Sequence, residues 1–221
     1  MKKTFGRFAG IVMLLGVLSM GCSMTGAQTM PHGKSMTATS ATKAADLREG
    51  LNALFGEHAM LAAAATGAAL DGREAEFKAN AAALDGNSVD IAKAIGSVYG
   101  PGAEQAFLPL WRRHIGFVVD YTVGLATKDR AKQDKAVGDL LGYTQDLAAF
   151  LSSANPNLPK AAVADLVKGH ILSLKEVIDA QAAKDPVRAA PALRQAYSHM
   201  HMIADPLADA IVKQFGDRFA G

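Results

Sequence analysis

Residues 107–118 read FLPLWRRHIGFV, and the chain repeats this pattern twice, once 56 residues earlier and once 56 residues later. The counterparts are LNALFGEHAMLA at residues 51–62 and VADLVKGHILSL at residues 163–174. Each run contains a histidine four residues after a leucine, at His58, His114 and His170. Apolar residues recur around each histidine at intervals of three and four, the period of a helix with one buried face. Three equivalent helices are predicted, each with a histidine on its apolar face.

The same register continues beyond these helices. Apolar residues of three further helices align at Ile91, Leu147 and Ile203, and turns align at residues 71–73, 127–129 and 183–185. Asp129 and Asp185 stand where helix N-caps are expected. The chain is therefore predicted to be all-α, a six-helix bundle of three repeated antiparallel helical hairpins at residues 51–100, 107–156 and 163–212. Pro109 and Pro206 fall inside predicted helices and are expected to kink or end them.

Residues 1–22 are predicted to be an export signal of the lipoprotein type. A basic start precedes an apolar stretch, residues 8–18, which is too short to cross a bilayer. Cys22 follows directly, in the position of a cysteine that is lipidated after cleavage; in the alternative, ordinary cleavage near Ala27 discards it. Residues 23–42, rich in Ser, Thr, Gly and Ala, are expected to be a flexible tether before a helical domain at 43–221. No stretch after residue 22 is expected to span a membrane.

Charge and cysteine content restrict the partners. The formal net charge is +2, and removing Lys2, Lys3 and Arg7 with the signal changes it to −1. A near-neutral chain without a basic run argues against nucleic acid as a partner. Cys22 is the only cysteine, so the fold must be stabilised by helix packing and not by disulfides. The sequence thus predicts an exported protein of the cell envelope, lipid-anchored on its periplasmic or outer surface.

Two arrangements of the three histidines are compatible with the pattern. If the hairpins pack around a common axis, His58, His114 and His170 converge, and three imidazoles with an open fourth position can bind zinc or copper. If the hairpins stack in a row, the histidines stay apart. Each would then be a core residue with its own hydrogen-bond partner. Aligned carboxylates are available for that role at Asp90, Asp146, Asp120 and Glu176.

A fourth histidine and a methionine extend the candidate metal site. His199 and Met202 lie three residues apart and share one side of a predicted helix. Imidazole and thioether together suit copper, especially Cu(I), outside the cytoplasm. The predicted metal ligands are therefore His58, His114, His170, His199 and Met202. Copper is the preferred ion, with zinc and haem as alternatives.

Signatures of catalysis are absent from the sequence. There is no Gly-rich phosphate loop, no Cys-x-x-Cys-His for covalent haem and no His-Glu-x-x-His motif. The sequence therefore predicts an extracytoplasmic binding protein and not an enzyme. One alternative is a structural or protein-interaction module of the envelope whose histidines are merely buried. Another is a protein that binds haem non-covalently.

Several motifs resemble a family of exported bacterial helical-repeat proteins. The similarity lies in Glu57-His58, in the run from Trp111 to Tyr121 and in Ser198-His199-Met200-His201-Met202, and covers about residues 45–219. Some members carry a copper amine oxidase label, but such oxidases are β-rich and this sequence contains no predicted strand. The resemblance implies an extracytoplasmic role and favours copper, without supplying a mechanism.

Overall fold

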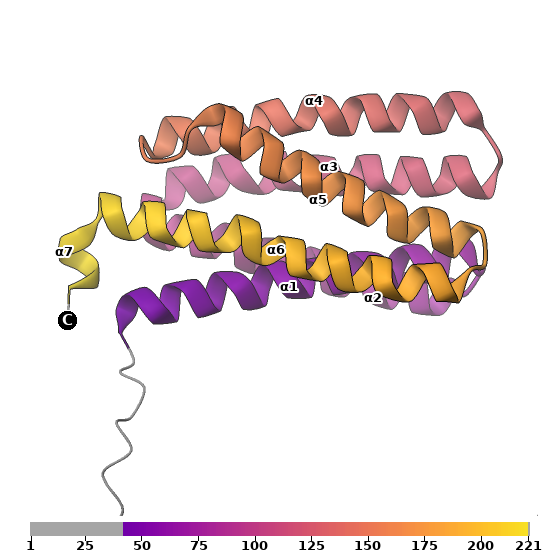
Figure 1. Ribbon diagram of the computed structural model, residues 1–221, viewed down its shortest axis with the longest axis horizontal. Coiled ribbons are helices and arrows are strands. Elements are labelled where there is room, and N and C mark those ends of the chain that lie inside the picture. The colour runs from indigo at the N-terminus through magenta and orange to yellow at the C-terminus, as the bar shows by residue number, and fades with distance from the viewer. Residues whose placement is uncertain (1–41, 221) are drawn as a thin grey trace, which may run out of the picture. The chain divides into compact units, whose positions relative to one another are not determined.

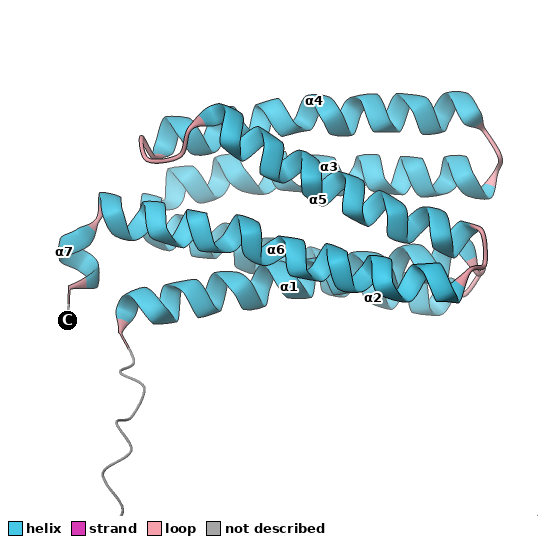
Figure 2. Cartoon of the chain, viewed as in Figure 1, coloured by secondary structure: helices cyan, strands magenta, loops and turns pink. Residues whose placement is uncertain are grey.

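The computed structural model describes residues 42–220. The long helices are α1 (Lys43–Leu70), α2 (Glu74–Tyr99), α3 (Pro101–Ala126), α4 (Arg130–Ala154), α5 (Lys160–Ala182) and α6 (Pro186–Gln214), followed by the short α7 (Gly216–Phe219). Residues 42–220 contain no strand (Figure 2). The prediction of an all-α chain with six long helices is confirmed. The predicted signal, residues 1–22, and all of the predicted tether except Thr42 lie outside the described residues.

The six long helices lie lengthwise in one bundle (Figure 1), and their contacts close it into a ring. Consecutive helices are antiparallel neighbours, and α6 packs against α1 as well as against α5. α1, α3 and α5 also contact one another, whereas α2, α4 and α6 each cover the junction between two of these three central helices. A row of hairpins would keep α1 and α6 apart, so the stacked arrangement is excluded. Equivalent positions on α1, α3 and α5 can therefore meet.

The central helices carry many of the large buried side chains, about as many as the outer helices. Those on the central helices include Leu51, Phe55, Phe107, Trp111, Val163, Val167 and Ile171. Burying a side chain of this size contributes roughly 1.5–3 kcal/mol. Fully buried alanines such as Ala59, Ala92 and Ala148 allow the helix backbones to approach closely. The core thus forms along the contact lines between central and outer helices.

Local signals place most helix ends as expected. Asp129 and Asp185 accept N-cap hydrogen bonds from the backbone of Lys132 and Arg188, both at 3.0 Å. α3 and α6, however, continue through Pro109 and Pro206, so of the two outcomes predicted there, a kink or a helix end, the helix end is excluded.

One expectation about membrane spans also needs correction. By length and hydropathy alone, α1 is apolar enough to cross a membrane. Half of its most apolar window is buried against the other helices, as expected for a central helix of a bundle. Its hydropathy comes largely from the alanines between Ala59 and Ala69. A run of alanines lacks the large apolar side chains by which a membrane span is usually recognised in a sequence.

The turns within the three hairpins share one backbone conformation. Their equivalent residues Gly72, Lys128 and Lys184 have φ angles of 71°, 57° and 57°. In each turn the next amide donates to a carbonyl five residues back, from Arg73 to Ala68, Asp129 to Gly124 and Asp185 to Ala180. Only glycine adopts this left-handed conformation without strain. Two of the three turns therefore hold a lysine in an unfavourable conformation.

We expect Lys128→Gly to raise the free energy of unfolding by about 0.5–1 kcal/mol, because it relieves the left-handed strain at a helix C-terminus. Gly72→Ala should lower it by about 1 kcal/mol for the same reason. Lys184→Gly should raise the free energy of unfolding by less than Lys128→Gly. The reason is that it also removes the hydrogen bond of 2.9 Å that the Lys184 ammonium donates to the Leu70 carbonyl. Urea unfolding followed by circular dichroism measures all three changes. Destabilisation by Lys128→Gly would contradict this account.

Candidate metal centre

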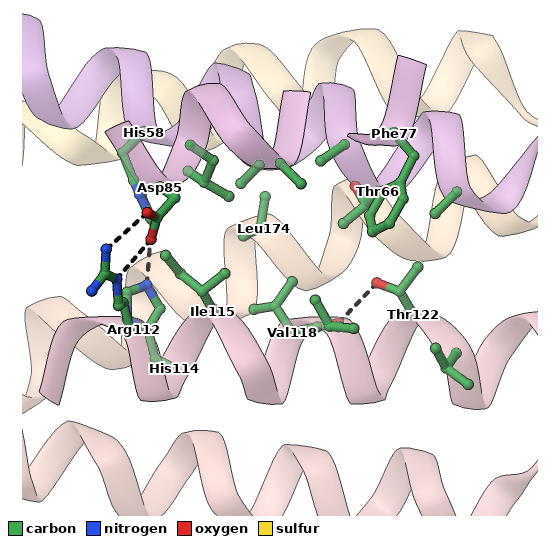
Figure 3. A pocket seen from close by; sticks show the side chains of 17 residues that line it. His58, Thr66, Phe77, Asp85, Arg112, His114, Ile115, Val118, Thr122 and Leu174 are labelled. Atoms are coloured by element: carbon green, nitrogen blue, oxygen red, sulfur yellow. Dashed lines mark hydrogen bonds and ion pairs between the residues drawn. The ribbon is translucent and has the colours of Figure 1, made fainter. Parts of the chain in front are cut away.

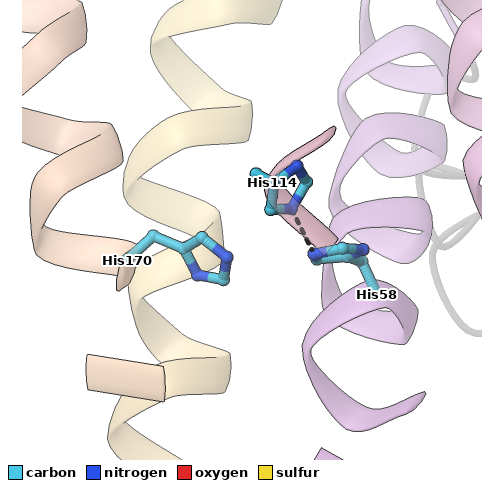
Figure 4. Close-up of side chains that lie close together, drawn as sticks. All are labelled: His58, His114 and His170. Atoms are coloured by element: carbon cyan, nitrogen blue, oxygen red, sulfur yellow. Dashed lines mark hydrogen bonds between the residues drawn. The ribbon is translucent and has the colours of Figure 1, made fainter. Parts of the chain in front are cut away.

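The three histidines of the repeated pattern converge at the centre of the bundle (Figure 4). His58 on α1, His114 on α3 and His170 on α5 each offer one ring nitrogen, and these atoms lie within 4.8 Å of one another. The Nε2 atoms of His58 and His114 are 3.3 Å apart. The three residues are only 1%, 3% and 5% exposed. The arrangement around a common axis is therefore the correct one.

Their spacing is close to that of a metal centre. Nitrogens bound to one ion lie about 2.0–2.1 Å from it, so two of them can be no more than about 4 Å apart. His58 and His114 already meet this condition. Since the whole set spans up to 4.8 Å, small rotations of the rings, by roughly 1 Å at the nitrogens, are enough to close the site.

No carboxylate hydrogen-bonds to any of the three histidines among the described residues. By hydrogen-bond geometry the Nδ1 atoms of His58, His114 and His170 have no partner within the described residues, although the backbone of Trp111 is close enough to His114 to raise its pKa. The aligned carboxylates that could have served instead form ion pairs with Lys93, Arg113, Lys132 and Arg188. An unsatisfied buried polar atom costs about 1–3 kcal/mol. Independent core histidines, each held by its own carboxylate, are therefore excluded.

Burial keeps the three imidazoles neutral. It lowers the pKa of His114 to about 3, with a further decrease from nearby His170 and a partial offset from the backbone of Trp111. The pKa of His170 falls to about 4, through burial and then through His199. Burial, followed by His114 and His170, also holds the pKa of His58 well below its ordinary value. A neutral imidazole has a free lone pair, which is the form that binds a metal.

Two aromatic side chains enclose the cluster on one side. The Trp111 ring centroid lies 4.9 Å from that of His58 and 4.6 Å from that of His114. Tyr143 stacks on His114 at 4.8 Å. The Trp111 Nε1 and Tyr143 hydroxyl are buried and have no hydrogen-bond partner in the described structure. Sequence reasoning did not assign either residue to the site, although Trp111 is only three residues from His114.

The other two predicted ligands, His199 and Met202, do not point into the cluster of His58, His114 and His170. Met202 is 56% exposed, so its side chain faces solvent. Met200 is 1% exposed and lines a cavity of about 20 Å³ together with His114 and His170. Met200, and not Met202, is therefore the methionine that shares a cavity with two of the histidines. The sequence pattern indicates that Met200 is the buried methionine, because Met200 falls on the same apolar stripe of the helix as Ile203 and Leu207.

His199 binds the backbone of a neighbouring helix. Its Nε2 lies 2.9 Å from the Leu166 carbonyl, and its ring packs where a Cβ on Gly169 would approach it to 2.5 Å. In the first hairpin the equivalent residue, Asn87, donates to the carbonyl of Leu54 at 2.9 Å. This contact therefore belongs to the packing of outer on central helices. His199 thus lies next to the histidine cluster, and its Nε2 is directed to the Leu166 carbonyl and not to the other three histidines.

Comparison with known protein families, curated proteins and solved structures finds no match for this chain. The resemblance to exported helical-repeat proteins accordingly stays a prediction. The fold and site define an all-α protein whose six long helices enclose a buried cluster of three histidines that could hold a metal ion.

Proposed function

We propose that this protein is an extracytoplasmic metal-binding protein in which His58, His114 and His170 hold one transition-metal ion. The observation that carries the proposal is the convergence of three buried imidazoles, each of which offers one ring nitrogen within 4.8 Å of the others. In an apolar core such an arrangement is unfavourable unless a ligand compensates for it. A metal ion bound by the converging nitrogens accepts their lone pairs and so supplies that compensation.

Copper in its Cu(I) state fits the chemistry of this site best. The ligands are neutral, and no carboxylate hydrogen-bonds to them in the described structure. The cost of placing an ion in a low-dielectric core rises with the square of its charge, so a monovalent ion is favoured over Zn²⁺. Met200 lines the same cavity as His114 and His170, and a thioether that binds from there would add a soft ligand of the kind that selects Cu(I).

Haem is less compatible with the geometry. The facing Nε2 atoms of His58 and His114 are 3.3 Å apart, which leaves no room for a porphyrin between them. The cavity shared by Met200, His114 and His170 has a volume of about 20 Å³, sufficient for an ion or a single water. Between the histidines themselves these dimensions favour a mononuclear ion, and only the larger cleft beside His58 and His114, described below, has room for a bulkier ligand.

The decisive experiment is anaerobic titration of the purified protein with Cu(I), Zn²⁺ and haemin, monitored by metal analysis and absorption spectra. One equivalent of Cu(I) should bind and raise Tm by on the order of 10 °C when the ligand is about 1,000-fold above Kd. A Soret band would replace this proposal with haem binding. If neither metal nor haem binds, an envelope interaction module becomes the better explanation.

We expect Met200→Leu to weaken Cu(I) binding by roughly tenfold while leaving Zn²⁺ binding nearly unchanged, because only the soft ion gains from a thioether. Leucine has a similar volume, so the loss of stability should stay below about 1.5 kcal/mol. Competition against a chromophoric chelator gives both affinities. Met202→Leu is the matched control, because Met202 is exposed. Equal losses for both metals would argue against sulfur coordination.

We further propose that Cys22 anchors the protein to a membrane, on the basis of the basic start and the apolar stretch that precede it. Cys22→Ser should then move the protein from the membrane fraction to the soluble fraction of the envelope, because no acyl chain can be attached. Fractionation followed by immunoblotting measures this shift. Identical fractionation of mutant and wild type would disprove lipid anchoring.

A further inference from the structure

A large apolar cleft runs beside the histidine cluster (Figure 3). It has a volume of about 540 Å³ and lies mainly between α1, α2 and α3. His58 and His114 are at one end, and Phe77 and Thr122 are at the other. On α1 its lining extends from His58 to Ala69, a distance of about 16 Å at the helical rise. The cleft is therefore long and narrow.

The bundle contains an equivalent of this cleft that is filled. A second cavity, of about 20 Å³, lies between α3, α4 and α5. Eleven of the twelve residues that line it correspond, 56 positions earlier, to residues of the large cleft. The two cavities are thus the same place in successive hairpins, and only one of them is open.

Side-chain size explains the difference. Three alanines of the open cleft correspond to larger residues of the filled one: Ala62 to Val118, Ala65 to Tyr121 and Ala81 to Val137. The third hairpin also has larger residues at these positions, namely Leu174, Val177 and Leu193. The fold therefore accommodates bulky side chains at these positions. In the first hairpin, small side chains leave the space open.

We propose that this cleft binds one elongated apolar molecule with the shape of a single acyl chain. Its volume lies within the roughly 300–1,000 Å³ of small-molecule sites. A protein helix of the same length would occupy on the order of 1,000 Å³, so it does not fit. Val119 and Val123 line the cleft and are 42% and 41% exposed, which provides an apolar entrance along α3.

The polar end of the ligand is assigned from the charged lining residues. Asp85 and Arg112 form a bidentate ion pair at 2.7 and 2.8 Å, next to His58 and His114 (Figure 3). Both side chains are about half exposed, so a head group there remains in contact with water. The tail then lies along Ala62, Ala65 and Ala69. This assignment rests on the cleft alone and does not require the metal.

The test uses dansyl-undecanoic acid as a fluorescent probe, with dodecanoic acid as its competitor, on metal-free and Cu(I)-loaded protein. The metal-free protein should bind one equivalent of probe with enhanced, blue-shifted emission that dodecanoic acid reverses. Absence of probe binding to the metal-free, folded protein would overturn the proposal. Because this arm contains no metal, its failure is distinguishable from failure of the metal proposal.

Variants locate the probe. Ala62→Val combined with Ala65→Phe reproduces the bulk of the filled cavity and should weaken probe binding at least tenfold. Ala81→Leu fills the cleft from α2 and should also weaken probe binding. This single variant keeps the test decisive if the double variant does not fold. Ala149→Phe adds bulk at an exposed site on α4 and should leave binding unchanged. Equal probe affinity in the folded filling variants and wild type would place the probe elsewhere and overturn the assignment.

Discussion

Replacing His114 by alanine is expected to weaken Cu(I) binding by more than about 100-fold, since even outer-shell residues of metal sites contribute 10- to 100-fold. His114 is the most informative ligand to remove, because its Nε2 lies 3.3 Å from that of His58 and its side chain lines the cavity shared with His170 and Met200. Two imidazoles remaining in an apolar core leave the ion undercoordinated and poorly compensated. Anaerobic competition with a Cu(I) chelator measures the affinity.

The controls separate loss of a ligand from loss of the fold. His114→Ala also removes core volume, so circular dichroism must show that the helices remain. His199→Ala should reduce Cu(I) affinity less than tenfold, because the His199 Nε2 is engaged by the Leu166 carbonyl. Met202→Leu should have no effect. If His114→Ala folds and retains wild-type Cu(I) affinity, the three-histidine site is wrong, and the residues form a buried polar cluster with a purely structural role.

The sequence alone predicts the convergence of the histidines only as one of two possible arrangements. The 56-residue register shows that His58, His114 and His170 occupy equivalent positions, whatever the arrangement of the hairpins. Whether equivalent positions meet depends on the contact between α1 and α6, which closes the ring. No local pattern encodes that contact, because it is made by residues about 150 positions apart. Asn52 and Asp205, for example, join α1 to α6 at 2.8 Å.

The choice between neighbouring methionines shows where sequence reasoning reaches its limit. Helical spacing correctly separates Met200 from Met202, since they point to different sides of α6. Met202 was favoured because it shares a side with His199. In the structure Met202 is 56% exposed, and the His199 ring turns to a backbone carbonyl of α5 in the space provided by Gly169. Side-chain direction at a helix contact depends on the partner helix, which a single-helix pattern does not contain.

The open cleft, by contrast, can be predicted from the sequence alone. Aligning the repeats by side-chain volume, in addition to polarity, reveals the alanines at positions 62, 65 and 81 opposite larger residues. A polarity pattern treats alanine and leucine as equivalent, so the deficit in volume is invisible to it. Interiors are close-packed, and volume decides whether a cavity forms. The comparison of volumes between repeats is therefore a means of locating sites in such proteins.

Acid should destabilise the metal-free protein steeply, starting near the ordinary histidine pKa. Burial holds the pKa of His114 at about 3 and that of His170 at about 4, and His58 is shifted in the same direction. In the unfolded chain each histidine titrates near its ordinary value of about 6.5. Between these values the unfolded state binds more protons than the folded state. Stability is therefore fully present above about pH 6.5 and is lost as the pH falls towards about 4.

With three histidines the free energy of unfolding should fall by up to about 4 kcal/mol per pH unit in this window, at about 1.4 kcal/mol for each proton. Urea unfolding of chelator-treated protein at half-unit pH intervals measures the slope. His170→Gln should reduce the slope by about one proton, because it removes one titrating group. Ser88→Ala, at a buried residue that does not titrate, should lower stability and keep the slope. A free energy of unfolding that stays constant between about pH 7 and pH 5 would mean that the histidines are not held neutral in the core.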